Sequence, residues 1–264
     1  MAIKMGKSTS INSVFKTFRL IESLREPNSE YSLTEITKKL DLSIGSAQRI
    51  TNSLITLGYL AKDKKTKKYR LTPKWLPIGF GVAASSAIRR IALPYLKQLY
   101  KETGQSISLV MRDKDEVIYL DRLIAPDLLR FNIRAGLRMP MYSNSMGKAI
   151  LAFLPYDERD VIIQKTVLNN NPGQEPVDEA EIKQELDIIR LRGYVVHRVQ
   201  FTGGALAIAA PILNHKGIAI AGFNIGMPPD TSMSDSTFDK NVQLLLHAAE
   251  DISSEIGYLG YMED

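Results

Sequence analysis

The chain lacks cysteine throughout its 264 residues. This absence excludes disulfides, thiolate nucleophiles and the zinc or iron–sulfur sites that depend on cysteine. Long apolar runs are also missing, since none reaches the roughly 18 residues that a membrane-spanning helix needs. The N-terminal residues have no signal-peptide core. We therefore expect a cytoplasmic protein with no membrane partner.

The sequence also lacks a set of residues that would perform catalysis. Residues 79–81, Gly-Phe-Gly, are too short a fragment for a dinucleotide-binding loop, and no G-x-S-x-G motif occurs. Serine and carboxylate residues are present, but without a base beside a nucleophile they are surface residues. The histidines follow no metal-ligand spacing; they are His197, His215 and His247. We expect no catalytic residue, no metal and no cofactor.

Positive charge is concentrated in the first 80 residues. They hold 15 Lys and Arg against 6 Asp and Glu, a net charge of +9, whereas residues 81–264 hold 19 against 23, a net charge of −4. A basic segment attracts an anionic partner such as double-stranded DNA, and the acidic remainder is repelled by it. The length suits two domains, a small N-terminal one and a larger C-terminal one.

Residues 32–58 have the pattern of two helices joined by a short turn. Ser32 and Glu35 have the S-x-x-E spacing of a capping box, and apolar residues follow at helical spacing as far as residue 40. A second helix is expected to begin after Ser43, as its N-cap, and to stop at Gly58. Such a pair is typical of a helix-turn-helix.

The second helix of this pair has a polar stripe beside its apolar one. Gln and Arg can form bidentate hydrogen bonds with purine edges, whereas Ser and Asn can bond base edges or phosphates. This chemistry suits the major groove of DNA. With the N-cap, the candidate DNA-binding residues are Ser43, Ser46, Gln48, Arg49, Asn52 and Ser53.

Two short strand patterns follow, at residues 59–62 and 68–71, with a turn at residues 63–67. The lysines of this hairpin are as compatible with a solvated surface as with DNA when they are considered alone. Their position directly after a recognition helix favours a wing that touches phosphates through counterion release. The candidate wing contacts are Lys62, Lys64, Lys65, Lys67 and Lys68.

The segments on either side of the winged unit have apolar patterns of their own. Upstream, one helical face is expected to complete a three-helix core; it consists of Val14, Phe15, Phe18, Ile21 and Leu24. Downstream, residues 83–92 favour a helix, and Pro94 can either start a second helix or kink the first. Two interpretations, a dimer contact or packing on the winged unit, are open for Trp75, Leu76, Ile78 and Phe80.

From residue 106 the pattern becomes one of strands with helices between them. Strands are expected at residues 107–111, 117–120, 129–134, 194–198, 206–213 and 218–226, and helices at residues 146–154, 178–192 and 235–256. Helices packed on a mostly antiparallel sheet predict an α+β ligand-binding domain. We expect a winged helix-turn-helix domain at 1–72, a linker helix region at 73–104 and an effector-binding domain at 105–264.

Several short motifs occur along the chain in a distinctive order. They include Ser32-Leu33-Thr34-Glu35-Ile36, Leu57-Gly58-Tyr59, Met146-Gly147-Lys148-Ala149, Gly193-Tyr194 and Ile208-Ala209-Ala210-Pro211-Ile212. In order and spacing they resemble the IclR family of bacterial transcriptional regulators, almost from end to end. Pro140-Met141-Tyr142-Ser143 and Ile256-Gly257-Tyr258 resemble the branch that includes the 2-keto-3-deoxygluconate repressors.

The resemblance implies a winged domain, a linker helix and a GAF-like effector domain, assembled as homodimers or dimers of dimers on operator DNA. It also implies a small anionic effector such as a carboxylate, an aromatic acid or a sugar acid. Amides at a helix N-terminus suit such a carboxylate. The positions that correspond to the family's effector pocket are Ser143, Asn144, Ser145, Met146, Gly147, His197, Ala207 and Asn224.

Three of these positions depart from the family. An acidic residue often stands at the position of His197, a cysteine at that of Ala207 and a serine at that of Asn224, so either the effector differs or the pocket has degenerated. His197 and Asn224 are equally open to a structural interpretation, and Ser143 and Ser145 could be helix caps. We expect a repressor; the alternative is a small-molecule-binding protein whose winged domain mediates protein association.

Overall fold

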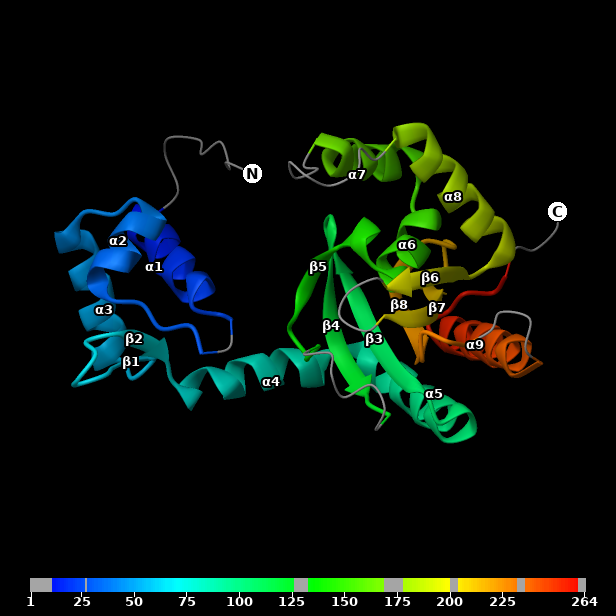
Figure 1. The fold of residues 1–264 in the computed structure, drawn as a ribbon, viewed down its shortest axis with the longest axis horizontal. Helices are drawn as coiled ribbons and strands as arrows, with labels where there is room; N and C mark the ends of the chain where they lie inside the picture. Colours follow the sequence, from blue (N-terminus) through cyan, green and yellow to red (C-terminus); the bar gives the residue numbers. More distant parts are fainter. Residues whose placement is uncertain are drawn as a thin grey trace. The chain divides into compact units, whose positions relative to one another are not determined.

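The computed structural model describes residues 11–26, 28–125, 133–168, 178–199, 204–231 and 236–260. The chain divides into two compact units, Met1–Ala83 and Ala84–Asp264 (Figure 1). The division lies within helix α4 (Leu76–Ser85). Each unit is described by itself.

The first unit is a three-helix core with a two-stranded hairpin. Its elements are α1 (Asn12–Ser23), α2 (Leu33–Leu40), α3 (Ile44–Thr56), β1 (Leu60–Lys62) and β2 (Tyr69–Leu71). The strands pair antiparallel, with Ala61 opposite Arg70. Apolar residues from all three helices and both strands form the core, among them Leu20, Ile36, Ala47, Leu60 and Tyr69.

The predicted turn between the two central helices is confirmed in its details. The amide of Ser32 donates to Glu35 Oε2 at 2.7 Å, and the amide of Glu35 donates to Ser32 Oγ at 3.3 Å, which completes the capping box. Asp41 ends α2 in the left-handed conformation, with φ of 52°. Ser43 then caps α3 by accepting from the amide of Ser46 at 3.3 Å. Side-chain hydrogen bonds therefore fix the start of both helices.

The predicted apolar face of α1 is only partly correct. Leu24 is buried, as is Leu20, which the pattern did not include. Val14, Phe15 and Phe18 are instead 46%, 38% and 53% exposed. The buried residues lie toward the C-terminal end of α1, so the small core covers only that part of the helix. Helical spacing identifies a face but not how far along the helix its partners extend.

Two helices with a break at Ser86 form the connecting segment. Short helix η1 (Pro73–Trp75) leads into α4, and α5 (Ala87–Thr103) begins after Ser86, whose Oγ accepts from the amide of Arg89 at 3.3 Å. Pro94 lies inside α5, seven residues after its start, so it does not begin a new helix. The indole of Trp75 donates to the carbonyl oxygen of Tyr59 at 3.0 Å, which anchors Trp75 on the winged unit.

The remaining apolar residues of this segment are exposed. Leu76, Ile78 and Phe80 have exposed fractions of 56%, 49% and 67%, so packing on the winged unit does not account for them. Within the described residues no single helix is long and apolar enough to cross a membrane. The pair Pro73–Ser85 and Ala87–Thr103, bent by 77°, meets the length and composition criteria together. In that pair, α5 contributes buried residues to the core of the second unit.

A six-stranded antiparallel sheet forms the centre of the second unit, in the order β5-β4-β3-β8-β7-β6. Its strands are β3 (Ser106–Asp113), β4 (Glu116–Leu123), β5 (Arg138–Pro140), β6 (Val195–Val199), β7 (Ala205–Leu213) and β8 (Ala219–Met227). Strands β3 and β4 are longer than expected, because only residues 114 and 115 form their turn. Most of the strand expected at 129–134 lies outside the described residues; residues 133 and 134 form no strand.

Helices cover both faces of this sheet. Helix α5 lies on one face with α9 (Ser236–Glu255), and the other face carries α6 (Ser145–Ala152), α7 (Tyr156–Leu168) and α8 (Glu179–Arg192) (Figure 1). The sequence pattern did not predict α7, whose consecutive apolar residues 161–163 form no helical stripe. The expected helix ends at α8 are confirmed: Asp178 caps its start, and Gly193 follows its end with φ of 78°.

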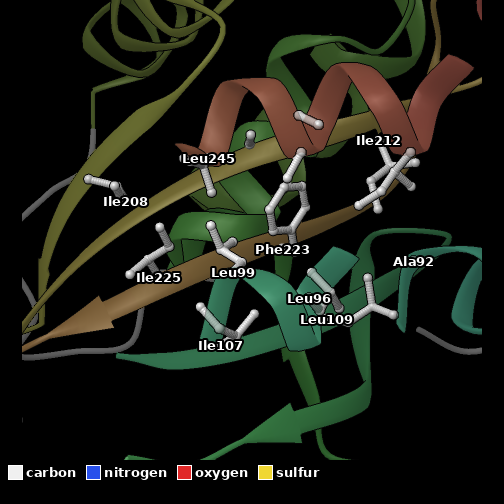
Figure 2. Packing of buried hydrophobic residues seen from close by; sticks show 14 of the residues in the cluster. Ala92, Leu96, Leu99, Ile107, Leu109, Ile208, Ile212, Phe223, Ile225 and Leu245 are labelled. Atoms are coloured by element: carbon white, nitrogen blue, oxygen red, sulfur yellow. The ribbon is translucent and has the colours of Figure 1, made fainter. Parts of the chain in front are cut away.

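Phe223 of β8 lies at the centre of the core on the α5 and α9 side. Figure 2 shows its ring surrounded by Leu96 and Leu99 of α5, Leu245 of α9 and residues of the neighbouring strands. The ring is fully buried. Because side chains alternate along a strand, residues 222, 224 and 226 face α6 instead. Successive residues of β8 therefore face α5 and α9 on one side of the sheet and α6 on the other.

Replacing Phe223 with Ala should lower the free energy of unfolding of the second unit by about 3–5 kcal/mol, since it removes a buried ring and leaves a cavity. Leu191→Ala is the control, because Leu191 of α8 in the same unit is 88% exposed, and its effect should stay within about 0.5 kcal/mol. Urea denaturation followed by circular dichroism measures both. Equal losses in the two variants would contradict this description of the core.

Candidate DNA interface and effector site

The predicted recognition stripe is exposed on α3. The side chains of Gln48, Arg49 and Asn52 are exposed, as is that of Ser53, whose hydroxyl donates to the carbonyl oxygen of Arg49 at 2.9 Å. Ser46 is half-buried, with its amide bonded to the cap of the helix. The structure therefore brings the predicted residues of this helix onto one accessible side.

A single carboxylate organises the turn between β1 and β2. Asp63 Oδ1 accepts from the amides of Lys65 and Thr66 at 2.8 and 2.7 Å and from Thr66 Oγ1 at 3.1 Å. These backbone hydrogen bonds hold the pKa of Asp63 below its ordinary value. The sequence placed Asp63 at the start of the predicted turn, but the role of its carboxylate was not predicted, although an Asp that begins a turn and bonds the amides after it is a known signal.

The wing lysines differ in their surroundings. Lys64, Lys65 and Lys67 are exposed, and Lys67 has a left-handed backbone with φ of 58°. Lys62 Nζ lies 5.1 Å from the centre of the Tyr69 ring, and Lys68 is half-buried. The tip of the hairpin therefore has three exposed lysines in a turn that the hydrogen bonds of Asp63 hold in place.

Three of the predicted effector residues lie on adjacent strands of the second unit. In β6 and β7, His197 is opposite Ala207, and in β7 and β8, Ala209 is opposite Asn224. Residues 206, 208, 223 and 225 belong to the core on the α5 and α9 side. The alternating residues His197, Ala207 and Asn224 therefore share the face that α6 covers.

The remaining predicted effector residues form the N-terminal end of α6. Asn144 is the cap: its Oδ1 accepts from the amide of Gly147 at 2.9 Å, and its Nδ2 donates to the carbonyl oxygen of Pro140 at 3.1 Å. Ser143 Oγ also donates to Pro140, at 2.8 Å. The cap is thus neither Ser143 nor Ser145. Since Gly147 already has a partner, a carboxylate at this end would meet the amides of Ser145 and Met146.

Gly147 has a packing role that its backbone position imposes. A Cβ atom at this position would lie 2.0 Å from the carbonyl oxygen of Met141, in the short helix η3 (Met141–Ser143). No side chain fits at that distance without moving the backbone. Glycine therefore allows η3 and α6 to approach each other closely.

A partly buried ion pair joins these elements to α8. Lys148 Nζ lies 2.7 and 2.9 Å from the two carboxylate oxygens of Glu185, and the hydroxyl of Tyr142 donates to Glu185 Oε2 at 2.9 Å. The Lys148 side chain is only 10% exposed and lies over the Tyr142 ring. Burial, followed by the charge of Glu185, raises the pKa of Tyr142, which keeps its hydroxyl protonated.

His197 lies within the electrostatic reach of this pair. Burial lowers the pKa of His197, the positive charge of Lys148 lowers it further, and Glu185 opposes both. The imidazole is therefore neutral near pH 7 in the free protein. An anionic ligand would have to raise this pKa before His197 could pair with it as a cation.

Two polar residues on this face, Ser108 and Arg122, escaped the sequence reading. Ser108 of β3 is opposite Arg122 of β4 on one side and Asn224 of β8 on the other, and its amide donates to Asn224 Oδ1 at 3.1 Å. Arg122 Nη1 donates to the carbonyl oxygen of Ile133 at 3.3 Å, and burial lowers the pKa of its guanidinium. The sequence carries no local signal for this placement, because it depends on the pairing register of β3 with β4, which shifts between Leu109 and Val110.

Comparison with known proteins identifies the family. The profile of the bacterial transcriptional regulator IclR C-terminal domain matches residues 80–254, and that of the IclR helix-turn-helix domain matches residues 13–64. The chain belongs to the IclR family. IclR-family proteins are transcription regulators and not enzymes, so this chain is a DNA-binding regulator with a winged helix-turn-helix and an α/β effector domain.

Individual relatives match along most of their length. The HTH-type transcriptional regulator KdgR of Escherichia coli (strain K12) is 29% identical over 96% of this chain and 95% of its own, which fits the branch that the motifs indicated. The crystal structure of the Thermotoga maritima IclR has a TM-score of 0.70 and 27% identity, covering 94% of this chain and 100% of that one.

One similar structure contains a ligand. It is an IclR homolog from Microbacterium hydrocarbonoxydans, complexed with 4-hydroxybenzoate, with a TM-score of 0.74 and 21% identity over 92% of this chain and 98% of that one. At this identity the similarity concerns the fold.

The environment of His197 predicts a specific dependence of stability on pH. Because its pKa is lower when folded than the ordinary 6.5, the unfolded chain binds more protons below that pH, and stability falls as the pH drops below about 6.5. His197→Gln should flatten this dependence, as measured by urea midpoints across a pH series. His215→Gln, at an exposed turn, is the matched control for the substitution itself. Parallel slopes for wild type and His197→Gln would refute the assigned surroundings.

Proposed function

We propose that this IclR-family regulator is a repressor that binds operator DNA as a homodimer or dimer of dimers and is controlled by a small carboxylate or sugar acid. The observation that carries the effector part is the group of polar residues on the α6 face of the sheet, where Ser108 is opposite Asn224 in β3 and β8, and His197 is opposite Ala207 in the adjacent pair β6 and β7. We assign the effector site to this face and to the N-terminal end of α6.

In this proposal α3 enters the major groove. Gln48, Arg49 and Asn52 read base edges, while Ser43, Ser46 and Ser53 bond phosphates or base edges beside them. The lysines of the wing, residues 62–68, contact phosphates and add affinity without sequence readout. The net charge of +9 in residues 1–80 supports this assignment over a winged domain that binds another protein.

The chemistry of the effector follows from the charges on the α6 face. Arg122 is a cation on this side of the sheet, and the N-terminal end of α6 adds positive potential, whereas Glu185 offsets the charge of Lys148. Neighbouring strands lie about 4.8 Å apart, so the three spacings from β3 to β6 span roughly 14 Å between backbones, which is wide enough for a small metabolite and not for a polymer. The aromatic acid held by the similar Microbacterium protein has this size and charge.

Control requires that the effector change the DNA affinity of the winged domain. We assign the linker role to residues 73–104, between a DNA-binding domain at 1–72 and an effector domain at 105–264. The exposed side chains of Leu76, Ile78 and Phe80 support a dimer contact in the linker. Effector and DNA then influence each other through one coupling free energy.

The experiment that tests the proposal is fluorescence anisotropy with the full-length protein. A duplex selected from a random-sequence library is compared with its shuffled version, with and without a panel of sugar acids and aromatic acids. Preference for the selected duplex, changed by one acid, supports the proposal. Equal, weak binding to both duplexes would favour the alternative, in which the winged domain mediates protein association. Sequence-specific binding that none of the acids changes would refute control by a small carboxylate or sugar acid.

Substitutions should separate sequence readout from phosphate contact. Gln48→Ala with Arg49→Ala should reduce discrimination between the two duplexes by roughly 1–3 kcal/mol per lost bidentate contact. Replacing Lys64, Lys65 and Lys67 with Ala should instead weaken binding to both duplexes alike and lower the salt dependence. Anisotropy titrations at several salt concentrations measure both effects. The assignment fails if the lysine variant loses only discrimination.

Filling the α6 face should block the effector. Ala207→Leu places a larger side chain opposite His197, so it should weaken effector binding at least tenfold while DNA binding without effector is kept. Ala180→Leu, at an exposed alanine of α8 away from this face, is the matched control. Calorimetric titration of the acid found above gives the affinity. If the Ala207→Leu variant binds the acid with wild-type affinity, the effector site does not lie on the α6 face.

A further inference from the structure

Ile44, the first residue of α3, has a large apolar side chain that is exposed to solvent. It is 66% exposed, whereas Ile50 on the inner side of the same helix is 9% exposed. Beside it, Gly45 is so open that an added Cβ would meet no atom of the described residues within 4 Å. The start of the recognition helix is therefore accessible and includes one apolar group.

The position of Ile44 relates it to the predicted reading residues. Residues 44, 48 and 52 are separated by four positions each, so Ile44, Gln48 and Asn52 lie along one side of α3. Side chains on a helix tilt toward its N-terminus, so Ile44 projects ahead of the others. In helix-turn-helix proteins the N-terminal residues of the recognition helix are those that contact base edges.

The chemistry of Ile44 leaves few partners in a major groove. Its side chain neither donates nor accepts hydrogen bonds, so amino groups, ring nitrogens and carbonyl oxygens would lose water against it without compensation. The 5-methyl group of thymine is the apolar feature that a base pair presents in this groove. Contact between the two removes both apolar surfaces from water.

We propose that Ile44 reads a thymine by contacting its 5-methyl group, and that this contact sets a preference for thymine at one base pair of each half-site. The inference rests on DNA binding by α3, as proposed above. It adds an apolar readout to the hydrogen bonds of Gln48 and Arg49, at a base pair next to theirs.

Deoxyuridine provides a direct probe, because it pairs as thymine does but lacks the methyl group. Starting from the duplex selected by the full-length protein, each thymine is replaced singly by deoxyuridine, and anisotropy measures the affinity. One replacement per half-site should weaken wild-type binding about fourfold, the effect of one buried methyl group. The salt dependence should stay the same, since no charge changes.

A double-mutant cycle assigns that loss to Ile44. Ile44→Ala removes the contact from both half-sites of a dimer, so it should weaken binding to the thymine duplex by about the square of that factor, and the variant should no longer respond to the sensitive deoxyuridine replacement. Ile55→Ala is the matched control, because Ile55 is a partly exposed isoleucine near the other end of α3. It should keep the full deoxyuridine response. Urea denaturation shows that each variant is folded.

The outcomes separate this inference from the proposed function. A wild-type protein that selects no duplex refutes sequence-specific binding itself. A protein that selects a duplex but tolerates every deoxyuridine replacement, or an Ile44→Ala variant that remains as sensitive as wild type, overturns the role of Ile44 alone. Loss of the response in Ile44→Ala but not in Ile55→Ala supports it.

Discussion

Strand β8 has an antiparallel neighbour on each side, and these two pairings position both faces of the effector domain. Opposite β3 and β7, its odd-numbered residues Phe223 and Ile225 enter the core under α5 and α9. Its even-numbered residue Asn224 then falls in line with Ser108 and Ala209 under α6. A slip of one residue would exchange the faces, placing polar groups in the core. The tight packing around Phe223 therefore also maintains the polar face.

The winged unit depends on local contacts more than on a large core. Side-chain oxygens of Ser32, Ser43 and Asp63 fix the starts of α2 and α3 and the turn of the wing. Each bond lies within three residues along the chain, so it forms as soon as the local backbone is in place. The reading helix and the wing are thus held by hydrogen bonds whose groups stay accessible to water.

Local signals of this kind are what made much of the fold predictable from sequence. The capping box at Ser32, the cap at Ser43 and the hairpin turn at residues 63–67 need only neighbouring residues to be recognised. The pairing of β3 with β8 joins residues more than a hundred positions apart, so Ser108 and Arg122 could not be placed beside Asn224. For the same reason the exposed half of α1 was misjudged, because the extent of its partners is a tertiary property. The predicted effector positions came from the family resemblance, and the structure shows that His197, Ala207 and Asn224 among them lie on one face of the sheet.

The hydrogen bonds of Asp63 in the turn of the wing bear on the entropy cost of the proposed contact with DNA. A basic loop without internal bonds would lose conformational freedom on binding, and this entropy cost would reduce its affinity. Here one carboxylate already holds the amides of Lys65 and Thr66, so the wing is preorganised before any phosphate arrives. The negative charge of Asp63 slightly offsets the lysines around it. If the wing contacts phosphates as proposed, the turn therefore gives up some electrostatic attraction and in return has less conformational freedom to lose on binding.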